Sequence, residues 1–340
     1  MSTWLWAFVL IIAAWGAHWG AEQLVKPLKN LRKQWGLTAS AGAAFLAIVT
    51  ASPEVGINVT SVLTGSAEIG LGNLLGSNII SIPLMVTIAY FATRKTFKQQ
   101  TGNSNSKNES HEQHLEEHIL YLDPKTVTVL ALPYLGILVL VAVLTLPVPW
   151  RGLQPIDGWI MLGAYLVFLA QAIFRGRGQG EKVEWSAKQI WLAIAGAAAI
   201  VVGAYFIVKA TENIVVAFGI SKVVGGLFIT GIMSTAPEVF KTWSVSRGGE
   251  VTAGTTSVIA DNAITMTVAF VPLALVSVPV QNFQLYWVNL LFVALMPILY
   301  IAFVSWGSKQ PGFKRWQVLA FDVSYLIYML VILLVIFQVI

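Results

Sequence analysis

Ten long apolar stretches leave this 340-residue sequence few folds to choose from. A helix of about 20 apolar residues crosses a bilayer, and inside lipid a chain must satisfy its own backbone polar groups. The stretches lie at roughly 3–25, 38–63, 69–93, 126–147, 157–174, 188–211, 222–245, 251–279, 282–305 and 317–339. Composition agrees, since 11% of the residues are charged, against about a quarter in soluble domains. We therefore predict an all-α polytopic membrane protein with ten transmembrane helices.

The basic residues predict how these helices are oriented. With the N-terminus outside, all but three of the 21 lysines and arginines lie in inner loops or at inner helix ends; the exceptions are Arg151, Lys209 and Lys222. Cytoplasmic loops of membrane proteins carry such an excess of positive charge. We therefore expect a multi-pass protein of a cell membrane with both termini outside. The net charge of +5 then reports orientation rather than nucleic-acid binding.

Two matching segments place a proline and a glutamate inside apolar stretches: "TASPEVGIN" (50–58) and "STAPEVFKT" (234–242). They fall in the second and seventh predicted helices, so they run in opposite directions through the bilayer. This arrangement is typical of transporters built from inverted repeats, whose substrate site lies near the bilayer midplane. We expect two inverted five-helix repeats at 1–174 and 188–340, a linker at 175–187, and a polar cytoplasmic loop at 97–123.

The two segments offer oxygen atoms that a cation could bind. A proline inside a helix frees the carbonyl four residues earlier, which here belongs to Val49 and to Met233. A divalent cation shared by two glutamates neutralises both of them, whereas a lone charged carboxylate at the midplane is costly. Hard oxygen donors of this kind suit Ca²⁺, which binds about six to eight oxygen atoms, and they also suit Na⁺. The candidate ligands are Glu54, Glu238, Thr50, Ser52, Ser234 and Thr235.

The next predicted helix in each half adds further polar side chains. In "EIGLGNLLGSNIISIP" (68–83), Gly72 and Gly76 form a small-residue face that lets another backbone approach closely. Its candidate ligands are Asn73, Ser77, Asn78 and Ser81, and those of "EVTAGTTSVIADNAITMT" (250–267) are Asp261, Asn262 and Thr265. Asp261 and Thr265 are four residues apart, so we expect them to share a helix face.

These segments resemble the repeats of the cation/calcium exchanger superfamily, and its prokaryotic sodium/calcium exchanger type most of all. "TASPE" followed by "GLGNLLGSNIIS" is similar to the first repeat, and "STAPE" followed by "ADNAIT" to a divergent second one. The resemblance implies ten helices in two inverted halves, with Na⁺ and Ca²⁺ alternating at sites between the second, third, seventh and eighth. It implies Glu54 and Glu238 as central ligands, with Thr50, Ala51, Ser234, Thr235 and Ser77 beside them.

The sequence departs from this family pattern at three places. Ser81 and Thr265 stand where such exchangers usually have Asn or Asp, and Asp261 stands at the expected serine. Two glutamates and a displaced aspartate would also suit a Ca²⁺/H⁺ or Na⁺/H⁺ antiporter. A passive channel is a further alternative, although an inverted repeat within one chain favours alternating access. We expect no enzyme, since aspartyl proteolysis needs two aspartates and Asp261 is the one we place deep in a helix.

The remaining expectations concern cofactors and partners. We expect Ca²⁺ and Na⁺ as transported ions, no organic cofactor, a lipid bilayer around the chain and no nucleic acid. With no cysteine in the chain, disulfides and thiolate metal sites are excluded. The histidine- and glutamate-rich segment 111–118 could bind a divalent metal, but we favour a solvated linker. The sequence leaves the protein partners unknown.

Overall fold

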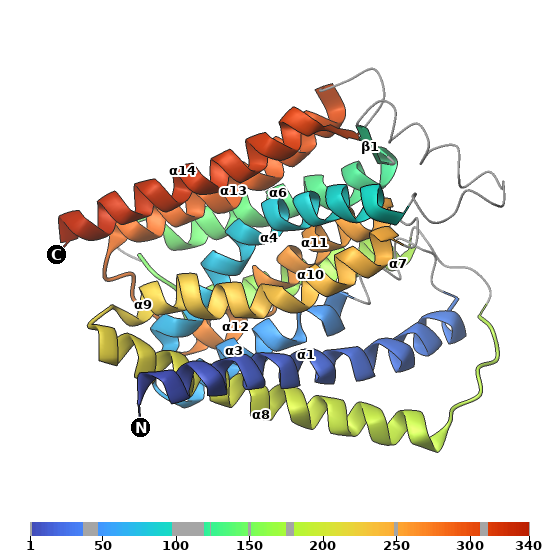
Figure 1. Ribbon diagram of the computed structural model, residues 1–340, viewed down its shortest axis with the longest axis horizontal. Helices are drawn as coiled ribbons and strands as arrows, with labels where there is room; N and C mark the ends of the chain where they lie inside the picture. The colour runs from blue at the N-terminus through green and yellow to red at the C-terminus, as the bar shows by residue number, and fades with distance from the viewer. Residues whose placement is uncertain are drawn as a thin grey trace. The chain divides into compact units, whose positions relative to one another are not determined.

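The computed structural model describes residues 2–36, 47–96, 119–122, 124–148, 151–174, 180–247, 251–306 and 312–339. The part of the chain that it describes is almost entirely helical, as predicted (Figure 1). Its elements are α1 (Thr3–Gln34), α3 (Ser52–Leu63), α4 (Ala67–Thr96), β1 (Ile119–Tyr121), α6 (Pro124–Thr145), α7 (Pro155–Phe174), α8 (Ala187–Phe218), α9 (Lys222–Gly225), the π-helix η2 (Gly226–Thr230), α10 (Gly231–Arg247), α11 (Val251–Thr265), α12 (Phe270–Leu275), α13 (Phe283–Trp306), β2 (Gly312–Lys314) and α14 (Arg315–Val339).

Several of these helices are long and apolar enough to cross a membrane. Among the described residues there are seven, together with two shorter apolar helices, Leu130–Thr145 and Pro155–Gln171. These nine coincide with nine of the ten predicted stretches. The second predicted stretch, 38–63, extends into residues that the structure does not describe, so the count of ten stays a prediction.

The chain divides into two compact units. Unit 1 comprises Met1–Asn78, Val139–Pro237 and Ala260–Gln281, and unit 2 comprises Ile79–Leu138, Glu238–Ile259 and Asn282–Ile340. Helices α4, α6, α10 and α11 contribute residues to both units.

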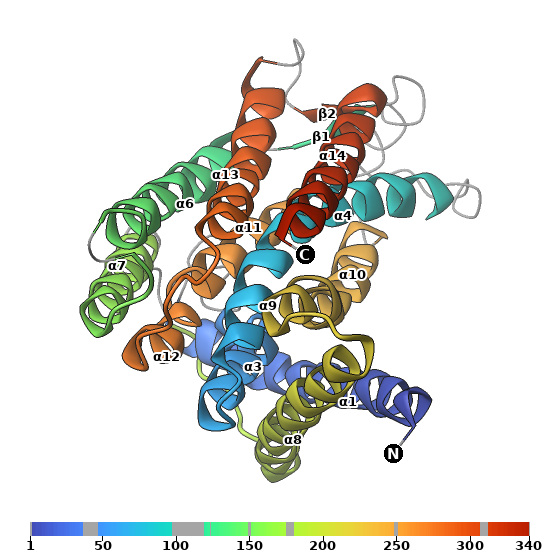
Figure 2. The ribbon, with the colours of Figure 1, turned by 90° about the vertical axis from the view of Figure 1, so that its left-hand side faces the viewer.

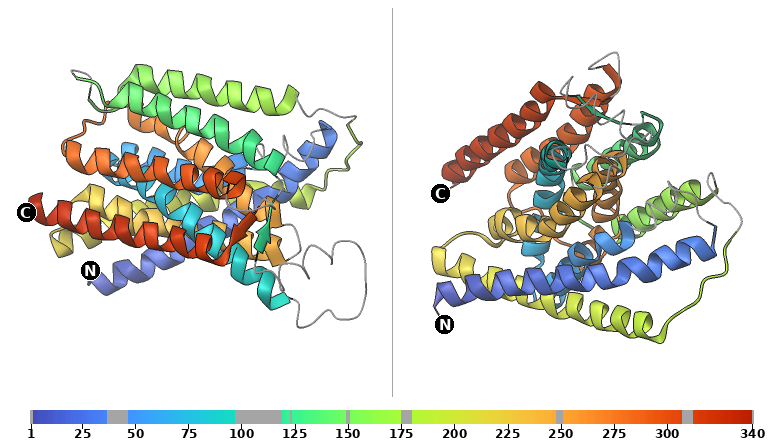
Figure 3. Two further views of the ribbon diagram at one scale, coloured as in Figure 1. Left: turned by 90° about the horizontal axis from the view of Figure 1, so that it is seen from above. Right: turned by 45° about the vertical axis from the view of Figure 1, so that its right-hand side comes forward.

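In unit 1, α1 and α8 lie side by side and antiparallel (Figures 1 and 3). Gly20 and Gly196 face each other, and a Cβ on either would collide with the backbone carbonyl of the other. A Cβ on Gly203 would also collide with Ala13 O and with Ala17 Cβ. Small residues let helix backbones approach in this way. The buried residues around this contact form one apolar core: Leu10, Ala13, Ala14, Ala17, Ile57, Ile69, Ala204, Ile207, Val208, Ala210 and Ile214.

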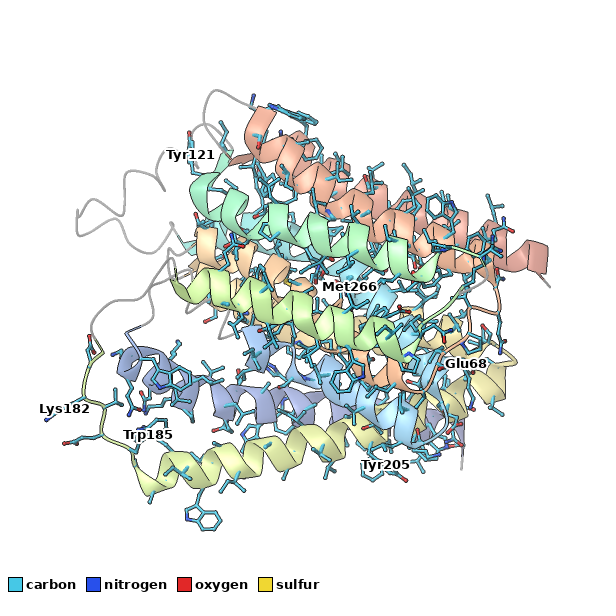
Figure 4. The ribbon with its side chains drawn as sticks, turned by 180° about the vertical axis from the view of Figure 1, so that it is seen from behind. Glu68, Tyr121, Lys182, Trp185, Tyr205 and Met266 are labelled. Atoms are coloured by element: carbon cyan, nitrogen blue, oxygen red, sulfur yellow. The ribbon has the colours of Figure 1, made fainter. Side chains whose placement is uncertain are left out.

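The remaining helices of unit 1 assemble around α3. Helix α3 packs on α8 and on α12, and α12 packs on α7 (Figure 2). The segment that leads into α8 lies against the end of α1, where Trp185 Nε1 donates to Gln34 Oε1 at 3.3 Å (Figure 4). The contacts of α3 with α8 and α12 hold α3 within unit 1.

In unit 2, α13 and α14 pack together beside the short antiparallel pair of β1 and β2 (Figure 2). The sequence does not predict these strands. Tyr300 stacks edge-on against Phe313 at a centroid distance of 4.9 Å. The Tyr328 hydroxyl donates to Asn289 Oδ1 at 2.7 Å, and this bond joins α14 to α13.

Candidate cation site

The first Pro-Glu segment lies at a break between two helical pieces. Residues 47–50 are helical, Ala51 is in a turn, and α3 begins at Ser52. Pro53 therefore occupies the start of a helix, where its missing N–H costs little. The sequence predicts Pro53 inside a helix, and that detail is wrong. The carbonyl of Val49 accepts a hydrogen bond from Ser52 Oγ at 2.6 Å, which uses one of its two lone pairs.

Glu54 is held in the first turn of α3 with 1% of its surface exposed. The free N–H groups at a helix N-terminus favour a negative charge. The break thus places a buried carboxylate where the backbone itself partly compensates its charge. Ala51, which precedes the new helix, is completely buried.

Helix α4 crosses the segment 223–227 at close range. Cβ atoms on Gly72 and Gly76 would collide with the backbone of Val223 and Leu227 respectively. The predicted small-residue face is therefore confirmed. The backbone on the other side belongs to α9 and η2, and π-helical turns often occur at functional sites.

Polar side chains of α4 lie buried next to this crossing. Asn73 Oδ1 and Ser77 Oγ are buried, and neither has a hydrogen-bond partner among the residues that the structure describes. Asn78 Nδ2 donates to the carbonyl of Leu74 at 2.7 Å. Asn73 and Ser77 are four residues apart on α4 and thus share a face.

Asp261 of α11 connects to the first Pro-Glu segment. Its carboxylate, 1% exposed, accepts a short hydrogen bond from Thr50 Oγ1 across 211 residues of sequence. Thr265 Oγ1 donates to the carbonyl of Asp261 at 3.0 Å, which confirms that the two residues share a face. Asn262 Nδ2 lies 3.5 Å from the carbonyl of Asn78. Within unit 1, α11 thus contacts Thr50 through Asp261 and α4 through Asn262.

The second Pro-Glu segment has a different backbone. Pro237 lies inside α10, which follows η2 without interruption. Ser234 and Thr235 both donate to the carbonyl of Gly231, at 3.1 and 2.6 Å. Glu238 begins the next part of unit 2 and is 6% exposed. Ser81, also in unit 2, is 1% exposed.

Asn58 and Tyr165 are among the buried polar residues of unit 1 that the sequence analysis does not name. Asn58 lies one turn after Glu54, and its spacing was the available signal; its Nδ2 donates to the carbonyl of Ala269 at 2.9 Å. Tyr165 of α7 is also buried. An isolated tyrosine in an apolar stretch gives no comparable signal.

These groups define the chemistry available. The described residues hold no group of three or more acids and histidines that could share one ion. A cation bound in unit 1 would instead combine a carboxylate with hydroxyl, amide and carbonyl oxygens. Such mixed oxygen sets suit Na⁺ and Ca²⁺ rather than zinc or copper.

Comparisons with known proteins decide the family. The model of the family described as sodium/calcium exchanger protein matches residues 5–174 and 188–334. This chain belongs to the sodium/calcium exchanger protein family. The resemblance seen in its repeats is thereby confirmed, and the protein is a multi-pass membrane protein of an antiporter family.

Solved structures share the fold of this exchanger. Structures of the sodium-calcium exchanger NCX_Mj, soaked with 100 mM Na⁺ and 10 mM Sr²⁺ or with 2.5 mM Na⁺ and 10 mM Sr²⁺, are each 19% identical, with a TM-score of 0.66. The alignments cover 96% of this chain and 98% and 99% of those chains. A third, soaked with 10 mM Na⁺ and zero Ca²⁺, has 18% identity and a TM-score of 0.64. Curated protein sequences give no match.

Proposed function

We propose that this chain is a secondary active antiporter that exchanges Na⁺ for Ca²⁺, with Glu54 and Glu238 as the central ligands. The observation that carries the proposal is the buried Glu54 carboxylate at a helix break in a chain of this family. A buried carboxylate needs a compensating cation or a proton. A Ca²⁺ ion bound between carboxylates supplies that compensation, and Na⁺ can replace it in the same oxygen set.

The other ligands complete the coordination of the ions. They are Thr50, Ala51, Ser52, Asn73, Ser77, Asn78, Asp261, Asn262 and Thr265, with Ser234, Thr235 and Ser81 from the remaining segments. The proposal is supported by the buried oxygens of Asn73 and Ser77, which have no hydrogen-bond partner within the described chain. The hydrogen bond that Asp261 accepts from Thr50 supports the proposal as well.

Transport proceeds by alternating access between two inverted five-helix halves, 1–174 and 188–340, with both termini outside. The match of the family model in two segments, 5–174 and 188–334, supports this division. The broken helix at Ala51 and the interruption between α11 and α12 support it as well, because discontinuous helices form the ion sites of many such transporters.

The test is Ca²⁺ uptake into liposomes that contain the purified protein. Three conditions are compared: an outward Na⁺ gradient, an outward H⁺ gradient and no gradient. We expect uptake only with the Na⁺ gradient. Uptake driven by H⁺ instead would make the carboxylates proton carriers, and the absence of gradient-driven Ca²⁺ flux in all three conditions would refute the proposal.

A further inference from the structure

A chain of two carboxamides and one carbonyl crosses the interior of unit 1. Asn73 Nδ2 of α4 donates to Asn58 Oδ1 of α3 at 3.1 Å. Asn58 Nδ2 in turn donates to the carbonyl of Ala269 at 2.9 Å. All three residues are completely buried. Three separate parts of the chain thus meet through one directional set of hydrogen bonds.

The direction of this chain is fixed at the Ala269 end. A carbonyl can only accept, so Asn58 must present its NH₂ group there and its oxygen to Asn73. Asn73 must then present its own NH₂ group to Asn58. Reversing either amide would bring two acceptors together in a buried place, where an unmade hydrogen bond costs about 1–3 kcal/mol.

The carbonyl of Ala269 lies at a helix interruption: as the N-cap of α12 it starts the hydrogen bonding of that helix, and its second lone pair remains for Asn58. Helix α11 ends at Thr265, and Met266 N and Ala269 N bond back to the carbonyls of Asn262 and Ile264, at 2.9 and 3.1 Å. Helix α12 begins one residue later, at Phe270. The interruption therefore supplies a fixed acceptor from which the two amides take their orientation.

The consequence appears at the other end of the chain. With its NH₂ group committed to Asn58, Asn73 turns Oδ1 away, and no residue in the described part of the chain donates to that oxygen. Ser77 Oγ, one turn further along α4, is likewise buried without a partner there. On α3, Glu54 lies one turn before Asn58. The Asn73 oxygen is thus a buried acceptor on the same helix face as the Ser77 hydroxyl, and such an oxygen is suited to binding a cation.

We propose that Asn58 is a positioning residue of the exchanger: together with the Ala269 carbonyl, it holds Asn73 so that Oδ1 faces the transported cation. This inference rests on the proposed function. Without Asn58, the Asn73 amide is free to rotate and to present NH₂ to the ion. The affinity for Ca²⁺ therefore falls while the turnover of the loaded protein is little changed.

The experiment measures Na⁺-driven Ca²⁺ uptake against Ca²⁺ concentration for Asn58→Leu, Asn73→Leu and the double variant. We expect each single substitution to raise KM about tenfold, the equivalent of one lost hydrogen bond of about 1.4 kcal/mol. Because Asn58 acts through Asn73, the double variant should be no worse than Asn73→Leu. Should Asn58→Leu fail to fold, Asn58→Ser replaces it, since a serine hydroxyl is too short to span both partners.

Asn289→Leu is the matched control. Asn289 is as buried as Asn58 and also both donates and accepts, to Leu285 O and from Tyr328, but it lies in α13. The Asn289→Leu substitution should lower the thermal unfolding midpoint and leave KM for Ca²⁺ unchanged. The same pattern for Asn58→Leu, or additive effects in the double variant, would overturn the positioning role. Normal uptake in Glu54→Gln would instead overturn the proposed function itself.

Discussion

The two Pro-Glu segments share the motif Pro-Glu-Val but have different backbones. Around Glu54 the helix breaks and restarts, so that the carboxylate lies in the first turn of α3. Around Glu238 the helix runs through Pro237 without a break, and the irregular turn lies earlier, at η2. The two glutamates are therefore positioned by different backbone conformations.

Two sequence differences accompany these two backbones. Ser52 donates to the carbonyl of Val49, whereas its counterpart Ala236 has no hydroxyl. Thr50 bonds to Asp261 on another helix, whereas its counterpart Ser234 bonds within its own helix, to Gly231. Of these two counterparts, Thr50 thus reaches another helix, and Ser234 bonds within its own.

The largest expected effect tests whether the two segments are nevertheless equivalent. Glu54→Gln and Glu238→Gln should each reduce Na⁺-driven Ca²⁺ uptake about hundredfold or more, because removing one charge from a buried charged set costs about 3–5 kcal/mol. Glu68→Gln, which alters a carboxylate at the start of α4 bonded to Gln281, is the control and should keep normal uptake. A mild Glu238→Gln variant would show that only the first segment binds the ions.

A smaller effect should separate the two hydroxyls. Thr50→Val keeps the shape of threonine but removes the bond to Asp261, so we expect KM for Ca²⁺ to rise about tenfold. Ser234→Ala removes a bond within one helix, and we expect about a twofold rise. Uptake measured against Ca²⁺ concentration checks both; equal effects would contradict the difference drawn between the segments.

Stability should distinguish the two residues that precede the prolines. Ser52→Ala deprives the Val49 carbonyl of its hydroxyl partner, which should cost about 0.5–1.5 kcal/mol and lower the thermal unfolding midpoint by about 1–2 °C. Ala236→Ser adds a hydroxyl where none is needed and should change the midpoint by less. Thermal unfolding in one detergent compares the two, and a larger loss for Ala236→Ser would reverse the interpretation.

The smallest effect is expected away from both segments. Glu212 accepts from Lys209 at 2.9 Å and from Lys222 at 2.8 Å, with all three side chains partly exposed. Partly exposed ion pairs contribute about 0–1 kcal/mol and are screened by salt. Lys209→Gln should therefore leave Ca²⁺ uptake unchanged and lower the unfolding midpoint slightly, at low salt only. A large loss of uptake would show that sensitivity to substitution is not concentrated at the two segments.

Much of the fold follows from the apolar pattern. The stretch 69–93 corresponds to the candidate span Ala67–Thr93, because a helix in lipid is encoded by its own residues. The close approach at Gly72 and Gly76 was predictable because small residues four positions apart let another backbone come near. The break at Ala51 and the bond from Thr50 to Asp261 were not. They depend on contacts between residues far apart in the sequence, for which local spacing gives no signal.

The most direct measurement is Ca²⁺ binding by isothermal titration of the purified exchanger, in Na⁺ and in an inert organic cation. If Na⁺ and Ca²⁺ share the oxygens around Glu54 and Glu238, Na⁺ should weaken Ca²⁺ binding competitively, and either Gln variant should abolish it. Ca²⁺ binding that persists in Glu54→Gln, or that is indifferent to Na⁺, would contradict a shared site at the paired glutamates.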